Sequence, residues 1–179
     1  MTESSPRRAR WLVPGVAAVV ALALGVFAFL QLPSPSPGAR DAAPLLGVSL
    51  PDTEGQTQSL AQWRGRLLIV NFWATWCAPC REEMPMFARA QALHGDRGLQ
   101  FVGIAVDEGP KVRQFAAEIG LNYPALIGGY GAMELSKTLG NSMMALPFTV
   151  VIDRKGSIVL TQLGPLTPAQ VDRLVAEFI

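Results

Sequence analysis

A strand of apolar residues that runs into two cysteines restricts the fold of this chain more than any other feature. Leu67 to Trp73 contain no charged residue, which is typical of a strand buried on both faces. Cys77 and Cys80 follow directly, three positions apart, and they are the two cysteines of the 179-residue sequence. Helical spacing of apolar residues begins just after them. We therefore expect a strand, a turn and a helix that carries both thiols at its start.

Residues 45–179 are predicted to form one domain of ordinary size. The pattern predicts a hairpin over 48–60, helices over 79–93 and 111–119, strands over 99–106, 148–152 and 157–163, and a last helix that begins with a capping box at Thr167. Strands and helices alternate early, and a strand hairpin comes late. This order predicts an α/β fold in which helices flank a mixed central sheet.

The N-terminal part has a different character. Residues 12–32 carry no charge, and as a helix they would span about 31 Å, enough to cross the core of a bilayer. Arg7, Arg8 and Arg10 precede them, which predicts a single transmembrane helix with residues 1–11 in the cytoplasm. A cleaved signal peptide is the alternative, but the bulky residues at 29–32 offer no small-residue cleavage site.

A proline-rich segment, residues 33–44, follows the predicted membrane helix. Such a composition favours an extended spacer without a core. The whole sequence has 15 Lys and Arg against 14 Asp and Glu. Since binding to nucleic acid requires a basic face, this balance argues against a nucleic-acid partner.

The placement of the two thiols predicts thiol–disulfide exchange. At a helix N-terminus, free backbone N–H groups and the helix dipole stabilise the thiolate of Cys77, which is the species that attacks a disulfide. Cys80 lies one helical turn further on and is placed to resolve the mixed disulfide. Pro79 lacks an N–H donor, so we expect it to make the pair less oxidising.

Other uses of a cysteine pair fit less well. A zinc or copper site needs further ligands, and the sequence offers one histidine, His94, so we expect no metal. A structural disulfide across two residues closes a very short loop and adds little stability. The sequence has no glycine-rich dinucleotide motif, so we expect no cofactor. Electrons for a working dithiol must then come from another protein.

A resemblance to a known family covers most of residues 45–179. The chain resembles the membrane-anchored TlpA/ResA-type thiol–disulfide oxidoreductases of the thioredoxin superfamily. The matching segments are residues 71–85 with Cys77-Ala78-Pro79-Cys80, Leu50-Pro51-Asp52, Leu146-Pro147-Phe148-Thr149 and Ile152-Asp153-Arg154-Lys155-Gly156. The resemblance implies a thioredoxin-like fold and a single-pass protein of the bacterial inner membrane, with its catalytic domain in the periplasm.

The resemblance also implies roles for residues around the cysteines. Pro147 matches a cis-proline that faces the pair, and Leu146 would present its backbone to an extended partner; a plain proline at a strand entry is the alternative. Trp76 would line the same docking surface beside Pro79. Glu83 matches an acidic residue near the active site that tunes thiol pKa values or moves protons, whereas the alternative is a solvated glutamate in the first helical turn.

Asn71 separates this chain from the cytoplasmic thioredoxins, which carry a buried aspartate at that place. Since Asn cannot accept a proton, we expect Glu83 to take over part of that role. The function implied is reduction of disulfides in partner proteins, for example the cysteines of apocytochrome c or metal-site thiols, with electrons from a membrane donor of the CcdA/DsbD kind. A copper-delivery module and a thiol peroxidase on the same fold are the alternatives.

Overall fold

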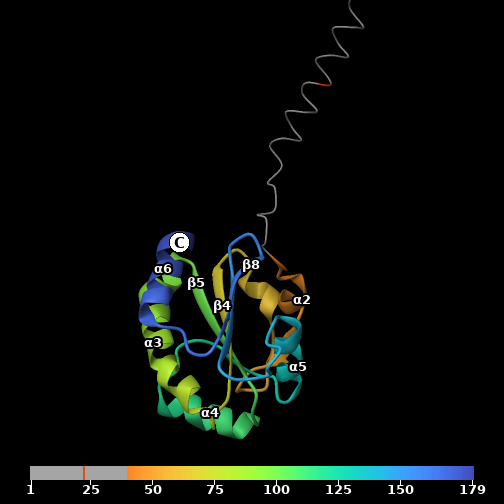
Figure 1. The fold of residues 1–179 in the computed structure, drawn as a ribbon. Coiled ribbons are helices and arrows are strands. Elements are labelled where there is room, and N and C mark those ends of the chain that lie inside the picture. The colour runs from red at the N-terminus through yellow and green to blue at the C-terminus, as the bar shows by residue number, and fades with distance from the viewer. Residues whose placement is uncertain (1–21, 23–39) are drawn as a thin grey trace, which may run out of the picture. The chain divides into compact units, whose positions relative to one another are not determined.

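The computed structural model describes residue 22 and residues 40–179, and the latter form one folded domain built on a mixed sheet (Figure 1). In chain order, its strands and helices are β1 (Arg40–Asp41), α2 (Ala43–Leu46), β2 (Ser49–Pro51), β3 (Thr57–Ser59), β4 (Leu67–Trp73), α3 (Ala78–His94), β5 (Leu99–Ala105), α4 (Gly109–Glu118), β6 (Ala125–Ile127), α5 (Gly131–Thr138), β7 (Phe148–Ile152), β8 (Ser157–Leu163) and α6 (Pro168–Phe178). Short 3₁₀ turns, η1 (Leu60–Trp63) and η2 (Gly95–Arg97), precede β4 and β5.

The central sheet has the strand order β1-β8-β7-β4-β5-β6. β4 pairs in parallel with β5 and antiparallel with β7, so the sheet is mixed, as the sequence predicts. The strands β2 and β3 form a separate antiparallel hairpin, which confirms the predicted hairpin. The predicted capping box is also present, because Thr167 and Gln170 bond to each other's backbone at the start of α6.

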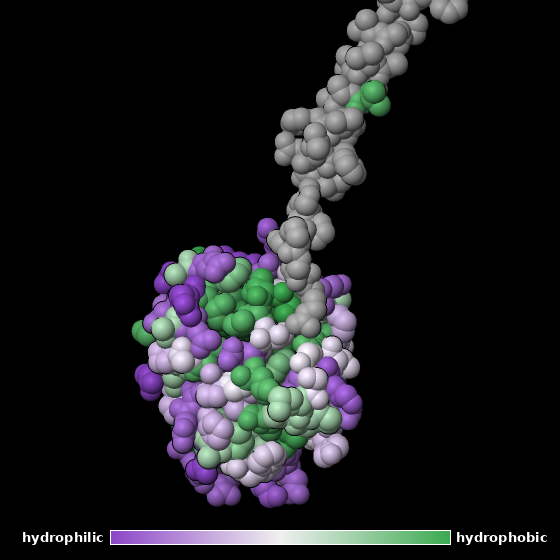
Figure 2. All heavy atoms as spheres, viewed as in Figure 1, coloured by the Kyte–Doolittle hydropathy of each residue, from purple (hydrophilic) through white to green (hydrophobic). Residues whose placement is uncertain are grey.

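Helices cover both faces of the sheet. The helices α3 and α6 pack on one face, and α2 and α5 lie on the other (Figure 1). Each face has its own apolar cluster, and every residue of β4, β5 and β7 is buried. Along β8, by contrast, most side chains are half-buried, and apolar residues are visible there among hydrophilic ones (Figure 2).

Four elements were not predicted. β6 has three residues and α5 has eight, so neither is long enough to show a clear apolar period. β1 and α2 lie at 40–46, where the sequence predicted a proline-rich linker up to residue 44. The helix α2 forms because Leu45 and Leu46 are buried in the domain, so the folded part begins at about residue 40.

The predicted membrane helix, residues 12–32, lies outside the described residues except for Leu22. In the part of the chain that the structure describes, no helix combines the length and the apolar character that crossing a bilayer requires.

The strand register defines two ends of the sheet. Phe72 of β4 lies opposite Phe148 of β7, so the loop that carries the cysteines and the loop before β7 share one end. At the other end, Leu68 lies opposite Ile152, and β1 pairs with the first residues of β8. The chain therefore enters the domain at the end opposite the cysteines. Because β4 has seven residues, about 20 Å separates the two ends.

A close approach of Trp73 to β5 requires glycine at position 103. The Trp73 side chain is fully buried, and a Cβ atom on Gly103 would lie 2.7 Å from the indole Nε1. Contacts this short force the neighbouring side chain to move, and the packed core around Trp73 leaves little room for that movement.

We expect Gly103→Ala to lower the free energy of unfolding by about 1–3 kcal/mol, because it overpacks the core. Gly131→Ala is the matched control, since nothing lies within 4 Å of its Cβ position and alanine favours a helix. Denaturant unfolding of both variants with the disulfide intact measures the effect. Equal stabilities would show that Trp73 does not need this glycine.

Candidate active site

Cys77 and Cys80 form a disulfide at the N-terminus of α3, with their Cα atoms 5.3 Å apart. Cys77 is the N-cap residue, and its sulfur accepts a hydrogen bond from the backbone N–H of Cys80 at 3.3 Å. The same N–H group would stabilise a Cys77 thiolate once the disulfide opens. Cys77 is 5% exposed and Cys80 is 0% exposed, so of the two cysteines Cys77 lies nearer the surface.

The loop before Cys77 is held by Asp107, which is the second residue after the end of β5. Its Oδ2 atom accepts hydrogen bonds from the hydroxyl and the backbone N–H of Thr75, the latter at 3.2 Å. Its Oδ1 atom accepts from the N–H of Glu108 at 2.8 Å. Burial opposes ionisation of Asp107, but these hydrogen bonds prevail and lower its pKa. The anion therefore fixes the start of the turn that carries the thiols.

Glu83 is buried, with 4% of its surface exposed, and lies one helical turn after Cys80 on α3. Its two carboxyl oxygens accept hydrogen bonds at 2.9 Å from the side chain of Asn71 and from the backbone N–H of Leu166. Burial raises its pKa to about 7, against the lowering effect of both hydrogen bonds. The alternative of a solvated glutamate is therefore wrong, whereas neighbouring Glu82 is exposed.

Asn71 acts as a hydrogen-bond donor between strand and helix. Its Nδ2 atom donates to Glu83 and, at 3.0 Å, to the hydroxyl of Thr149 on β7. Tyr123 is buried as well, and burial together with the nearby charge of Glu83 raises the pKa of its phenol. With Asn71 and Tyr123 both unable to accept a proton at neutral pH, Glu83 is the proton acceptor of this buried cluster.

The loop before β7 lies at the same end of the sheet as the cysteines. The Leu146–Pro147 peptide bond is cis, as the family resemblance implies. Leu146 is half-buried and packs against the apolar cluster that contains both cysteines. Pro147 is buried and turns its carbonyl toward Gly164, which donates its N–H at 2.9 Å. The structure thus brings the predicted Leu146 and Pro147 to the site.

Exposed apolar residues surround the disulfide. Trp76 is 69% exposed directly before Cys77, and Pro79 is exposed between the cysteines. Met143, in the loop that leads to Pro147, is 75% exposed. On the α4 side, Arg81 lies over the ring of Phe115, 5.1 Å from its centroid. Of the predicted binding residues, Trp76 and Pro79 therefore lie on the surface, whereas Leu146 is half-buried and Pro147 is buried.

Sequence reasoning missed Asp107, Tyr123 and the Leu166 backbone. Asp107 had a usable signal, because it follows a buried strand parallel to β4, and the carboxyl ends of parallel strands meet at one edge. Tyr123 and Leu166 carried no such signal. They lie far from Glu83 in sequence, and their proximity depends on how the loops after α4 and β8 fold back over α3.

The raised pKa of Glu83 makes the stability of the oxidised protein depend on pH. Its folded value of about 7 lies above its ordinary value of 4.5, so the folded state retains a proton that the unfolded chain releases. The contribution of Glu83 to stability is therefore greatest below about pH 4.5 and falls by about 3 kcal/mol as the pH rises to 7 and beyond. Glu83→Gln should remove this decline. Denaturant unfolding across this pH range measures it, and a variant that keeps the full decline would contradict the assignment.

Comparisons with known proteins agree with this geometry. The sequence matches the Redoxin family over residues 38–176. The thiol-disulfide oxidoreductase ResA of Geobacillus kaustophilus is 31% identical over 126 residues, which are 69% of this chain and 70% of that protein. The thioredoxin-like protein YneN of Bacillus subtilis is 33% identical over 129 residues, or 70% of this chain and 72% of that protein.

A solved structure agrees as well. The crystal structure of a thiol:disulfide interchange protein of the thioredoxin family from Chlorobium tepidum superposes with a TM-score of 0.67 at 32% identity, covering 73% of this chain and 92% of that one. The fold is therefore thioredoxin-like. With a disulfide at a helix start, a buried carboxyl one turn away and a family match over most of its length, the chain belongs to the Redoxin family and is a thiol-disulfide oxidoreductase of the TlpA/ResA type.

Proposed function

We propose that residues 12–32 tether this enzyme to the bacterial inner membrane and that its domain reduces disulfides of partner proteins in the periplasm. The proposed substrates are apocytochrome c and proteins with metal-site thiols. The observation that carries the proposal is the unequal burial of the Cys77–Cys80 pair, in which Cys77 keeps 5% of its surface exposed and Cys80 keeps none. A partner can therefore form a mixed disulfide with Cys77 alone, and Cys80 remains free to break it.

The reaction follows from this arrangement. In the reduced enzyme, the Cys77 thiolate attacks one sulfur of the partner's disulfide, and the partner's other sulfur leaves as a thiolate that takes up a proton. Cys80 loses its proton and attacks the sulfur of Cys77, which releases the partner's second thiol. Two electrons have then passed to the partner, and the enzyme carries the disulfide that the structure shows.

The resolving step needs a proton acceptor near Cys80. Glu83 lies one turn away on α3, and its pKa of about 7 suits it to accept and return a proton near neutral pH. Regeneration needs two electrons and two protons, which we assign to a membrane donor of the CcdA/DsbD kind acting on Cys77.

Docking of the partner uses the surface formed by Trp76, Met143, Leu146 and cis-Pro147. Leu146, directly before Pro147, carries no strand partner among the described residues, so its backbone is available to an extended peptide. The N–H and carbonyl of Ala145, by contrast, are bonded to the side chain of Asn141. Trp76, directly before Cys77, and Met143, in the loop that leads to Pro147, offer exposed apolar area at this end of the sheet. A partner with an extended, apolar segment around its cysteine fits this surface.

Cys80→Ser should trap the mixed disulfide, because the attack on Cys77 that releases the partner is lost. When the reduced full-length variant is mixed with oxidised apocytochrome c, we expect a dithiothreitol-sensitive adduct through Cys77 on non-reducing gels. Cys77→Ser is the matched control and should give none. Adducts of equal yield with both variants, or no adduct with Cys80→Ser, would argue against the proposed order of attack.

Glu83→Gln tests the proposed proton acceptor. Removing a carboxylate one turn from Cys80 should shift the thiolate titration of the reduced protein to lower pH, by about one unit or less, because a nearby negative charge disfavours the thiolate. Glu82→Gln is the control, since Glu82 is exposed and water screens its charge. Ultraviolet absorbance of the thiolate measures the curve, and an unchanged curve in Glu83→Gln would rule out this role.

A further inference from the structure

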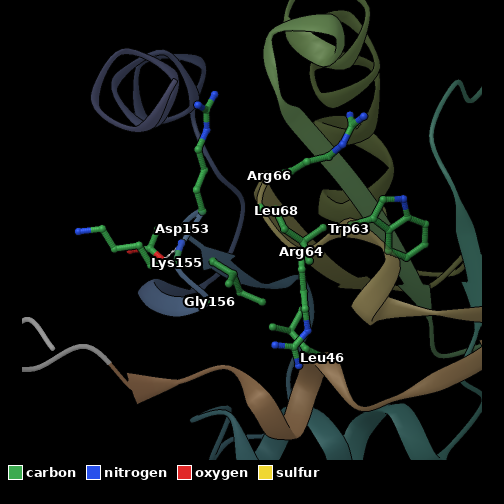
Figure 3. A pocket seen from close by; sticks show the side chains of 11 residues that line it. Leu46, Trp63, Arg64, Arg66, Leu68, Asp153, Lys155 and Gly156 are labelled. Carbon is green, nitrogen blue, oxygen red and sulfur yellow. Dashed lines mark hydrogen bonds between the residues drawn. The ribbon is translucent and has the colours of Figure 1, made fainter. Parts of the chain in front are cut away.

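A basic pocket lies at the end of the sheet opposite the disulfide. It has a volume of about 240 Å³ and lies between the turn after η1, the turn between β7 and β8, and α2 (Figure 3). Four exposed cations line it, namely Arg64, Arg66, Arg154 and Lys155, and we call this set the basic pole. The pole is a local feature, because the whole sequence is close to neutral with 15 basic and 14 acidic residues.

The cations of the basic pole are not neutralised. Among the described residues, the ion pairs involve Lys111 and none of these four side chains. Asp153 is the one carboxylate among the residues that line the pocket, and its Oδ1 atom already accepts from the backbone N–H groups of Lys155 and Ser157, at 2.9 and 2.8 Å. The charge of the pole is therefore available to an external anion.

Two of the guanidinium groups are held in place by backbone carbonyls and still have N–H donors that these bonds do not use. Arg66 donates to the carbonyl of Gly95 at 3.3 Å, and Arg154 donates to the carbonyl of Arg97 at 2.9 Å. Each guanidinium carries five N–H donors, so most of them remain for phosphate oxygens.

The cations spread outward and do not converge on one point. Arg64 extends toward Leu46, Arg66 extends to the other side of the pocket, and Lys155 points away from both (Figure 3). Groups spread in this way can contact several phosphates of a surface at once.

The chain also enters the domain at this end. β1 pairs with the start of β8, and Ala42 donates its N–H to the carbonyl of Gly156, which lines the pocket. Only residues 33–39 lie between the predicted membrane helix and β1, and seven residues reach at most about 25 Å. The entry point therefore keeps the basic pole near any membrane that holds residues 12–32.

We infer that the basic pole binds the anionic phospholipid headgroups of the membrane and thereby turns the Cys77–Cys80 end of the domain away from the bilayer. The inference rests on the proposed membrane tether. Positive side chains close to an anionic bilayer surface are attracted to it, and the attraction weakens with added salt.

The test uses the full-length chain in nanodiscs of phosphatidylcholine alone or mixed with phosphatidylglycerol. Hydrogen exchange of the amides at 64–66 and 153–156 should be at least about threefold slower in the anionic discs, because bound headgroups cover these turns. High salt should remove the difference. Amides at 76–82, at the disulfide end, serve as the internal reference and should exchange alike in both discs.

Two variants and a matched control distinguish a loss of lipid binding from a loss of folding. Replacing all four pole cations with Gln should abolish the difference, and the double variant Arg64→Gln/Lys155→Gln, which keeps the backbone bonds of Arg66 and Arg154, should reduce it. The matched control removes four exposed cations elsewhere, Arg89, Arg113, Lys137 and Arg173, and should keep it. Equal exchange of the unmodified chain in both discs would overturn the inference, as would loss of the difference in the control.

The remaining outcomes separate the possible anions and the tether itself. If inorganic phosphate protects the same amides equally well in neutral discs, the pole is a site for a free anion and the inference fails. Resistance to carbonate extraction from neutral discs reports the tether alone. If the chain is extracted from neutral discs but anionic lipid still protects the pole amides, the proposed tether is wrong and the inference about the basic pole stands. If the chain is retained and these amides are not protected, the tether stands and the inference about the basic pole is wrong.

Discussion

The central position of β4 is the constraint on which the rest of this structure depends. The strand is paired on both edges and buried on both faces, so its direction fixes where the chain emerges from the sheet. Its last residue is followed by a turn that Asp107 holds in place, and this turn delivers Cys77 to the N-cap position of α3. Because β7 runs antiparallel beside it, the same strand also places the loop of cis-Pro147 next to the disulfide.

The elements that the sequence predicted are those with long or fully apolar patterns. β4, β5 and β7 are buried runs, and α3 and α6 show clear helical starts, so their positions follow from local sequence. The missed elements, β1, α2, β6 and α5, are short. β1 forms by pairing with β8, and the other three form because they bury apolar residues in the domain. The residues of the site divide in the same way, into those that local sequence predicts and those that depend on contacts across the fold. Cys77 and Cys80 follow from spacing, whereas the cluster around Glu83 depends on contacts with Asn71 and Leu166 across the fold.

Burial of Glu83 shows how the fold maintains an ionisable group beside a redox pair. Two hydrogen bonds hold the carboxyl in one orientation, and the apolar surroundings keep its proton affinity near the neutral range. A water-exposed glutamate at the same helical position would remain ionised and would have no protonation change to contribute at neutral pH. The substitution of an acidic residue by Asn71 in β4 is consistent with this, since a second buried carboxyl beside Glu83 would add repulsion between like charges.

The proximity of Glu83 to the disulfide links the flow of electrons to the flow of protons. When two electrons reduce the disulfide, negative charge develops on sulfur one helical turn from a carboxyl whose pKa is about 7, and the carboxyl binds a proton more tightly in response. Over the pH interval between its two affinities, reduction takes up a proton at the carboxyl oxygen in place of the proton that a thiolate does not bind. The midpoint potential of the couple then changes more steeply with pH than it would for the same thiol and thiolate without the carboxyl, so the reducing power of this enzyme responds to the acidity of its compartment.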